Sequence, residues 1–266
     1  VPLGEEGPDM EVVRDLVAND ASIKGIWCVP RYSNPTGVTY SDEVVDALAS
    51  MKTAAPDFRI FADNAYAVHH LNDSPPPLKN ILKACKAAGN PNRVFMFGST
   101  SKVTFAGAGV CFMAASRENI DYLANLFSTQ SIGPNKVNQL RHVRFLESVP
   151  GGLSGHMQRH ADLLRPKFEI VYEVLGAELA GSGLATWTEP VGGYFVSLDT
   201  QPGMATKVVA LAKELGLTLT GAGAAFPYGK DPQDSNIRIA PTRPSEAEVR
   251  MAMEMLAVCI KSAAGV

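Results

Sequence analysis

Residues 94–115 read VFMFGSTSKVTFAGAGVCFMAA. Two apolar runs, residues 94–97 and 110–115, enclose a turn that is rich in hydroxyl and small side chains and contains Lys102. We expect both runs to form buried strands. A lysine that serves only solubility has little reason to occupy such a turn. Lys102 is therefore a candidate for chemistry.

The segments around this turn alternate between amphipathic helical patterns and short apolar runs, from residue 9 to residue 114. Such alternation is typical of βαβ units and predicts an α/β fold whose mostly parallel sheet is sandwiched by helices. We expect strands at residues 26–29, 59–62, 94–97 and 109–114. We expect helices at residues 10–17, 41–53 and 77–88.

The second half of the chain has a different pattern. Helical periodicity predicts helices at residues 117–127, 136–147 and 153–179, the last kinked at Pro166. Short strands at residues 185–188, 193–198 and 237–239 and a closing helix at residues 245–262 follow. We therefore expect residues 1–150 to form part of a large domain, 151–180 a long interdomain helix, and 181–266 a smaller C-terminal α+β domain.

The composition of the 266 residues bounds the class of protein. A hydrophobic content of 46% supplies a sizeable core, and a net charge of −3 with scattered Lys and Arg argues against a nucleic-acid partner. No apolar run reaches the roughly 18 residues that span a bilayer, so we expect no membrane partner. Four distant cysteines without CxxC spacing indicate a reduced, cytoplasmic protein: Cys28, Cys85, Cys111 and Cys259. His69 and His70 lack the spacing of a metal site, and we expect no metal.

Polar residues directly follow three of the expected strands. These loops are residues 33–37, 63–66 and 99–102. Because ligands of parallel sheets collect at the carboxyl ends of the strands, we expect the three loops to converge on one edge. Lys102 is suited to forming a Schiff base, and Asp63 is suited to pairing with the ring nitrogen of a pyridine cofactor that serves as an electron sink. Tyr66 could donate to the phenolic oxygen of that cofactor.

Four motifs carry a family resemblance: Asn34-Pro35-x-Gly37, Asp63-x-x-Tyr66, Ser99-x-Ser101-Lys102 and a late Arg238. Their order and spacing resemble fold-type I pyridoxal phosphate (PLP) enzymes of the class I/II aminotransferase group. Within that group, residues 101–109, 226–231 and 237–241 resemble the branch of candidate aspartate aminotransferases that is related to the effector domains of MocR-type regulators. The resemblance extends over essentially the whole chain.

The resemblance implies pyridoxal 5'-phosphate as the cofactor, held by Lys102 as an internal aldimine. It places six side chains around that cofactor: Asn34, Asp63, Tyr66, Ser99, Ser101 and Lys102. Asp63 would pair with the pyridine nitrogen, and Asn34 and Tyr66 would bond the O3′ oxygen. Ser99 and Ser101 would bind the phosphate, although either hydroxyl could instead bond the local backbone. The large domain would then be the cofactor-binding domain.

The resemblance also implies a reaction and its partners. A homodimeric aminotransferase would move an amino group from an aspartate-like amino acid to a 2-oxo acid. Arg238, with Asn34, would bind the substrate α-carboxylate, because the planar guanidinium fork matches a carboxylate. Two alternatives stay open. Arg238 could form a structural ion pair, or Arg243 could be the carboxylate ligand in its place.

Two departures from the family pattern bear on these expectations. Many relatives carry a phosphate-binding arginine shortly after the lysine, where this chain has GAGV at residues 107–110. Nothing before Asn34 matches the glycine-rich phosphate loop or the ring-stacking aromatic. We therefore expect an N-terminal portion of the same protein to be absent from this chain. Two alternatives follow: an effector-binding domain of a MocR-like regulator, or a fragment unable to bind the cofactor alone. Lyase or decarboxylase chemistry on the same scaffold also stays open.

Overall fold

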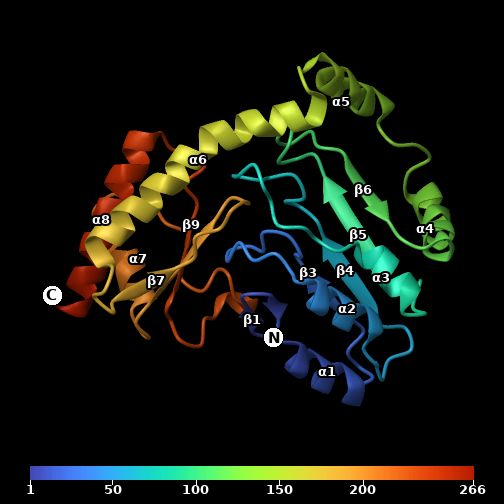
Figure 1. The fold of residues 1–266 in the computed structure, drawn as a ribbon, viewed down its shortest axis with the longest axis horizontal. Coiled ribbons are helices and arrows are strands. Elements are labelled where there is room, and N and C mark those ends of the chain that lie inside the picture. Colours follow the sequence, from blue (N-terminus) through green and yellow to red (C-terminus); the bar gives the residue numbers. More distant parts are fainter. The chain divides into compact units, whose positions relative to one another are not determined.

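A computed structural model describes residues 1–266, and the contacts within it divide the chain into two compact units (Figure 1). Unit 1 comprises residues 1–31, 38–68 and 76–157, and unit 2 comprises residues 32–37, 69–75 and 158–266. The last crossing between the units lies within helix α6, Gly152–Leu179. Residues 32–37 and 69–75 thus group with the C-terminal part of the chain. The domain boundaries predicted near residues 150 and 180 stay a prediction.

Unit 1 is built on a four-stranded sheet with the order β3-β4-β5-β6. The strands are β3 Gly25–Cys28, β4 Arg59–Asp63, β5 Val94–Ser99 and β6 Cys111–Ala114. The first three are parallel, and β6 pairs antiparallel with β5. The α/β class and the mostly parallel sheet are therefore confirmed.

Three helices cover one face of this sheet. They are α1 Met10–Asn19, α2 Asp42–Ser50 and α3 Ile81–Ala87. Each begins after a side chain that accepts a hydrogen bond from a backbone amide of the first turn: Asp9, Ser41 and Asn80. Their apolar sides bury Ile60, Ala62 and Val94, which lie on one face of β4 and β5 because side chains alternate along a strand.

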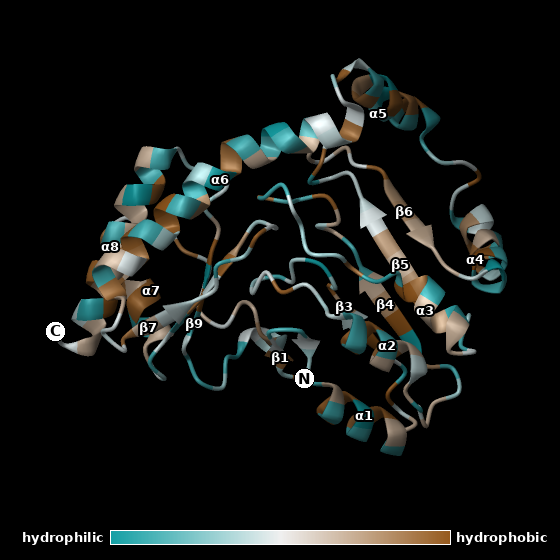
Figure 2. Ribbon diagram, viewed as in Figure 1, coloured by the Kyte–Doolittle hydropathy of each residue, from teal (hydrophilic) through white to brown (hydrophobic).

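The opposite face of the sheet is aromatic. The ring of Trp27 on β3 stacks on those of Phe61 and Phe97, with centroid distances of 5.7 and 5.9 Å. Trp27 is nevertheless 63% exposed, and Phe112 on β6 is 62% exposed. The expectation that both strands beside Lys102 are buried was therefore wrong for β6, because no helix of unit 1 covers it. Figure 2 shows the hydrophobic colouring of β4 and β5.

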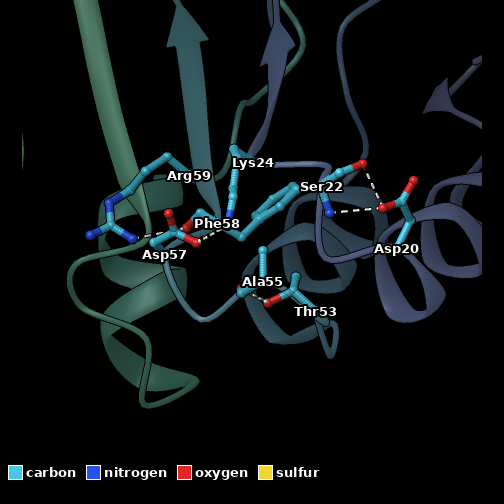
Figure 3. A network of polar contacts seen from close by, with 8 residues as sticks. All are labelled: Asp20, Ser22, Lys24, Thr53, Ala55, Asp57, Phe58 and Arg59. Carbon is cyan, nitrogen blue, oxygen red and sulfur yellow. Dashed lines mark hydrogen bonds and ion pairs between the residues drawn. The ribbon is translucent and has the colours of Figure 1, made fainter.

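The amino ends of β3 and β4 carry a polar network (Figure 3). Lys24 forms an ion pair with Asp57 at 2.8 Å, and Arg59 donates to the carbonyl of Phe58 at 3.1 Å. The ion pair between Lys24 and Asp57 joins the loops that enter the two strands. These contacts lie at the end of the sheet opposite to the carboxyl ends, where the candidate site residues follow the strands.

The remaining elements of unit 1 are a short hairpin and two helices. The hairpin is β1 Leu3–Gly4 with β2 Gly7–Pro8. The helices are α4 Arg117–Gln130 and α5 Lys136–Ser148. Both helices lie close to their predicted bounds.

Unit 2 contains an antiparallel sheet with the order β7-β8-β9. Its strands are β7 Ala185–Trp187, β8 Val196–Thr200 and β9 Asn236–Ile239. The main part of α6 packs on this sheet with two further helices, α7 Ala205–Glu214 and α8 Glu246–Ala264. A 3-10 turn, η1 Pro227–Gly229, lies outside this core. Helix α6 runs through Pro166 without interruption. None of the helices combines the length and the apolar character needed to cross a membrane.

Candidate functional site

Lys102 lies in a tight turn that directly follows β5. The amides of Val103 and Thr104 both donate to the carbonyl of Thr100, each at 2.9 Å. Thr100 also exchanges two bonds with Val110, because its amide donates to the Val110 carbonyl at 2.9 Å and its Oγ1 accepts from the Val110 amide at 2.8 Å. The backbone around the lysine is thus fixed, while the Lys102 side chain is exposed.

His156 supports this turn, although no sequence motif pointed to it. Its Nε2 lies 2.6 Å from the carbonyl oxygen of Val103, the residue after the lysine. The imidazole packs edge-on against Phe145 of α5, with a centroid distance of 5.1 Å. The beginning of α6 therefore holds the Lys102 turn in place.

Asp63 is the last residue of β4, the strand next to β5, and Tyr66 lies on the loop that follows it. Lys102 Nζ lies 5.4 Å from the centroid of the buried Tyr66 ring. The amide of Asn64 donates to the carbonyl of Phe97 at 2.9 Å, which joins this loop to β5. Asp63 is half-buried and makes no ion pair within the chain, and the buried Oδ1 of Asn64 has no hydrogen-bond partner. This end of the sheet thus has unused polar capacity.

Ser99 and Ser101 are joined to each other. Ser99 Oγ donates to Ser101 Oγ at 2.9 Å, and the Ser101 amide donates back to Ser99 Oγ at 3.1 Å. The local bonding considered as an alternative is therefore present. A Cβ placed on Gly109 would lie only 2.1 Å from Ser101 Oγ and 2.8 Å from Ser101 N. This close approach requires glycine, so no arginine side chain could start from position 109.

Arg238 and Asn34 form a second pair, within unit 2. Arg238 is on β9, and its Nη1 donates to Asn34 Oδ1 at 3.3 Å. The guanidinium carbon lies 4.7 Å from the centroid of the Phe195 ring. Its buried Nε has no hydrogen-bond partner, and no carboxylate lies within ion-pair distance. The structural ion pair weighed for Arg238 is thus absent. The sequence carries no signal for Phe195, because its pattern is that of any strand residue.

The Asn34 loop owes its shape to Gly37. The Gly37 amide donates to the carbonyl of Ser33 at 2.6 Å, with a φ of 76° that favours glycine. A Cβ at this position would lie 2.2 Å from Cβ of Pro190. The loop therefore packs against the segment that leads into β8.

Arg243, the rival of Arg238, lines a cavity of about 750 Å³ within unit 2. Lys167 and Tyr194 share this cavity, and burial raises the pKa of Tyr194. Lys167 Nζ donates to the carbonyl of Thr242 at 3.0 Å. No group of three His, Cys, Asp or Glu side chains is arranged to hold a metal ion.

The structure thus assembles the predicted residues in two sets. Five lie at the carboxyl ends of β4 and β5 or on the loops that follow these strands in unit 1: Asp63, Tyr66, Ser99, Ser101 and Lys102. The other two, Asn34 and Arg238, are in contact within unit 2. The loop at residues 33–37, which we expected at the same sheet edge, is part of the second set.

Comparisons with known proteins extend over the whole chain. A family model described as aspartate amino-transferase matches residues 1–266. A candidate aminotransferase of Mycolicibacterium smegmatis is 56% identical over 264 residues, which is 99% of this chain and 61% of that protein. The aspartate aminotransferase of Corynebacterium glutamicum is 49% identical over the same shares. The crystal structure of a candidate aminotransferase from Corynebacterium diphtheriae matches with a TM-score of 0.96 and 53% identity, covering 99% of this chain and 65% of that one.

The chain spans about 61% of the length of these curated relatives. The family match and the structural match agree with the motifs around Lys102, Asp63, Asn34 and Arg238. The chain belongs to the aspartate aminotransferase family, whose members are fold-type I, PLP-dependent aminotransferases.

Proposed function

We propose that this chain supplies the lysine and the carboxylate-binding residues of a PLP-dependent aminotransferase that moves an amino group from an aspartate-like amino acid to a 2-oxo acid. The observation that carries the proposal is the arrangement at the carboxyl ends of β4 and β5. There the Lys102 amine lies over the Tyr66 ring, on the loop that begins at an unpaired Asp63 carboxylate. A lysine and a carboxylate in neighbouring loops are the two groups that such a cofactor requires.

The residues of unit 1 fit PLP. Asp63 has no cation of its own, so its carboxylate is available to a protonated pyridine nitrogen and would be stabilised by it. Tyr66 would donate to the phenolic oxygen. The contact between Gly109 and Ser101 leaves the Ser99 and Ser101 hydroxyls on a narrow turn suited to phosphate.

The cofactor, when bound, supplies an electron sink for the bonds at the substrate Cα. Lys102 Nζ would hold the cofactor covalently and, once released by the substrate, take up the proton that leaves Cα. The fixed backbone of residues 100–104 and the bond from His156 to Val103 would hold that amine at a constant position.

Arg238 and Asn34 would bind the α-carboxylate. The guanidinium has an unpaired Nε and a long 3.3 Å bond from Nη1 to Asn34. A carboxylate could therefore take a bidentate position on the fork while Asn34 remains beside it. Phe195 would hold the plane of the guanidinium by stacking.

We also propose that the open aromatic face of the unit 1 sheet is covered by an N-terminal portion of the same protein. Trp27 is 63% exposed on a stacked cluster with Phe61 and Phe97, and the curated relatives are longer than this chain. Exposed aromatic clusters of this kind mark interfaces. We propose in addition that the protein forms a homodimer, as the family resemblance implies.

The emission of Trp27 tests this cover. In a Trp187→Phe background Trp27 is the only tryptophan of the 266-residue chain, which has two. In the longer protein any tryptophan outside these 266 residues is replaced by phenylalanine as well. We expect its emission to lie at shorter wavelength in the longer protein than in the 266-residue chain. Equal emission maxima in the two proteins would contradict the cover.

The cofactor proposal is tested in the longer protein by adding PLP and recording the visible absorption of the bound cofactor. We expect a band that Lys102→Ala abolishes, whereas Lys136→Ala on α5 leaves it unchanged. A band of equal strength in the Lys102 variant would contradict the assignment. The same titration of the 266-residue chain decides whether this part binds the cofactor alone.

A panel of amino donors with 2-oxoglutarate then tests the reaction. Transfer from aspartate or glutamate would support the proposed substrate class. Cofactor binding without transfer from any donor would favour the alternative, an effector-binding domain of a MocR-like regulator. Release of carbon dioxide or ammonia instead of transfer would indicate decarboxylase or lyase chemistry.

A further inference from the structure

Tyr32, two residues before Asn34, is buried in an unusual conformation. Its side chain is 1% exposed, and its φ is 51°. A bulky residue rarely adopts this left-handed backbone conformation unless the surrounding structure holds it there. The contacts that hold Tyr32 therefore also determine where the chain enters the Asn34 loop.

His70 provides the polar part of that hold. Tyr32 Oη and His70 Nδ1 are 2.7 Å apart and share a hydrogen bond, and the two rings meet edge-on at 5.7 Å. His70 also forms an antiparallel bridge with Gly192, flanked by bonds from the Gly193 amide to the His69 carbonyl and from the Leu71 amide to the Val191 carbonyl, both 2.9 Å. The histidine is thus fixed by backbone bonds on both sides.

Two glycines make room for the tyrosine. A Cβ on Gly192 would lie 2.2 Å from Cε2 and Cζ of the Tyr32 ring, and a Cβ on Gly193 would lie 3.0 Å from Tyr32 Cβ. The Tyr32 ring therefore lies directly against the backbone of Gly192, and Tyr32 Cβ lies against Gly193. This segment continues into Phe195, whose ring supports the Arg238 guanidinium.

One cluster of unit 2 therefore holds both members of the carboxylate-binding pair. Asn34 follows Tyr32 by two residues in the chain. Phe195 follows Gly193, which packs against Tyr32, by two residues, and the Phe195 ring contacts the Arg238 guanidinium. We infer that Tyr32 and His70 are positioning residues, which set the Asn34 carboxamide against the Arg238 guanidinium. The role of that pair in carboxylate binding rests on the proposed function. The positioning of the pair by Tyr32 and His70 does not.

The bond between Tyr32 and His70 can be removed from either end. Tyr32→Phe keeps the ring and removes the hydroxyl, and His70→Leu removes the partner. His70→Asn restores a polar atom close to the position of Nδ1. Tyr40→Phe is the matched control, because Tyr40 is a buried tyrosine of unit 1 whose hydroxyl bonds the Cys28 thiol.

The first readout is the kinetics of the longer, PLP-loaded protein. We expect Tyr32→Phe and His70→Leu each to raise KM for the amino donor about 3- to 10-fold, with kcat changed less than about 2-fold. The double variant should resemble either single variant, because both remove the same bond. His70→Asn and Tyr40→Phe should keep the wild-type KM.

The second readout is hydrogen exchange of the cofactor-free protein. The Gly37 amide, bonded to the Ser33 carbonyl within the Asn34 loop, should exchange about 3- to 10-fold faster in Tyr32→Phe and unchanged in Tyr40→Phe. Unchanged exchange and unchanged KM in Tyr32→Phe would overturn the inference, as would an equal rise of KM in the control. A wild-type protein without turnover would contradict the proposed function, while the exchange experiment would still decide the positioning role.

Discussion

Replacing Gly109 by alanine tests whether the turn beside Lys102 binds the cofactor phosphate. The new Cβ would lie 2.1 Å from Ser101 Oγ, 2.8 Å from Ser101 N and 2.9 Å from Ser101 Cα. Two of these three atoms belong to the backbone, so a change of side-chain rotamer cannot relieve the overlap. The backbone of residues 99–101 or of residue 109 must move.

The size of the effect follows from the overlap. Ordinary contacts of a Cβ begin near 3.4 Å, so Ser101 N, at 2.8 Å, must move away by about 0.6 Å. Overpacking of this kind costs about 1–3 kcal/mol. If the displaced serines bind the phosphate, a loss of about 2 kcal/mol of binding free energy raises the dissociation constant of PLP by about 30-fold. The bonds between Thr100 and Val110 should keep Lys102 on its turn.

The assay is a titration of PLP into the cofactor-free longer protein, followed by absorption. Gly133→Ala is the matched control, because a Cβ there meets no atom within 4 Å and the glycine does not have a positive φ. An unchanged dissociation constant in Gly109→Ala would refute the phosphate assignment of Ser99 and Ser101. A rise of equal size in Gly133→Ala would mean that the effect is not local.

Three further predictions concern unit 2 and helix α2. Arg238→Lys should raise KM for the amino donor about 10- to 100-fold with cofactor absorption retained, because lysine keeps the charge and loses the fork; an unchanged KM would exclude Arg238 as the carboxylate ligand. Burial raises the pKa of the Asp231 carboxyl, but bonds from three backbone amides outweigh it and hold that pKa below its usual range. The ionised carboxyl therefore stabilises the fold above its unfolded pKa of about 3.9, and this stability is lost as the pH falls through the lower folded pKa. Asp231→Asn should therefore make the melting temperature depend less on pH below about 4. Parallel curves of melting temperature against pH for the variant and the wild type would contradict this. Ser41→Ala should lower the free energy of unfolding in urea by about 1 kcal/mol, whereas Ser50→Ala on the same helix should change it little, since only Ser41 caps an amide of the first turn.

Much of the fold could be predicted because local chemistry agrees with it. Ser41 is followed by acidic residues and an apolar stripe, and α2 begins where these signals place it. Helix α7 had no such signal, because Met204 at its N-cap makes no side-chain bond to the first turn. The strand expected at residues 193–198 begins later, at Val196, since Gly192 and Gly193 are used for the bridge to His70 and the contact with Tyr32.

In the candidate site, too, residues marked by a local pattern could be predicted, whereas residues joined only by contacts between distant parts of the sequence could not. Asp63, Tyr66, Ser99 and Lys102 could be grouped in advance, because they follow neighbouring parallel strands and such loops meet at one edge of a sheet. His156 could not be found in this way, since its bond to Val103 joins residues 53 positions apart and leaves no periodic pattern. Its role depends on the packing of α5 and α6, which a single sequence does not encode in a readable form.

Tyr32 illustrates why such residues are missed. In the sequence it precedes a turn motif, where a tyrosine carries no particular meaning, and the motif itself draws attention to Asn34. Its importance comes from a positive φ, a histidine 38 positions away and two glycines more than 150 residues later, none of which can be associated with it before the chain is folded. A motif identifies the residues that touch a ligand, because the ligand dictates their chemistry. The residues that hold them can be of many types, provided that they fill the space, and only the packing of the folded chain identifies them.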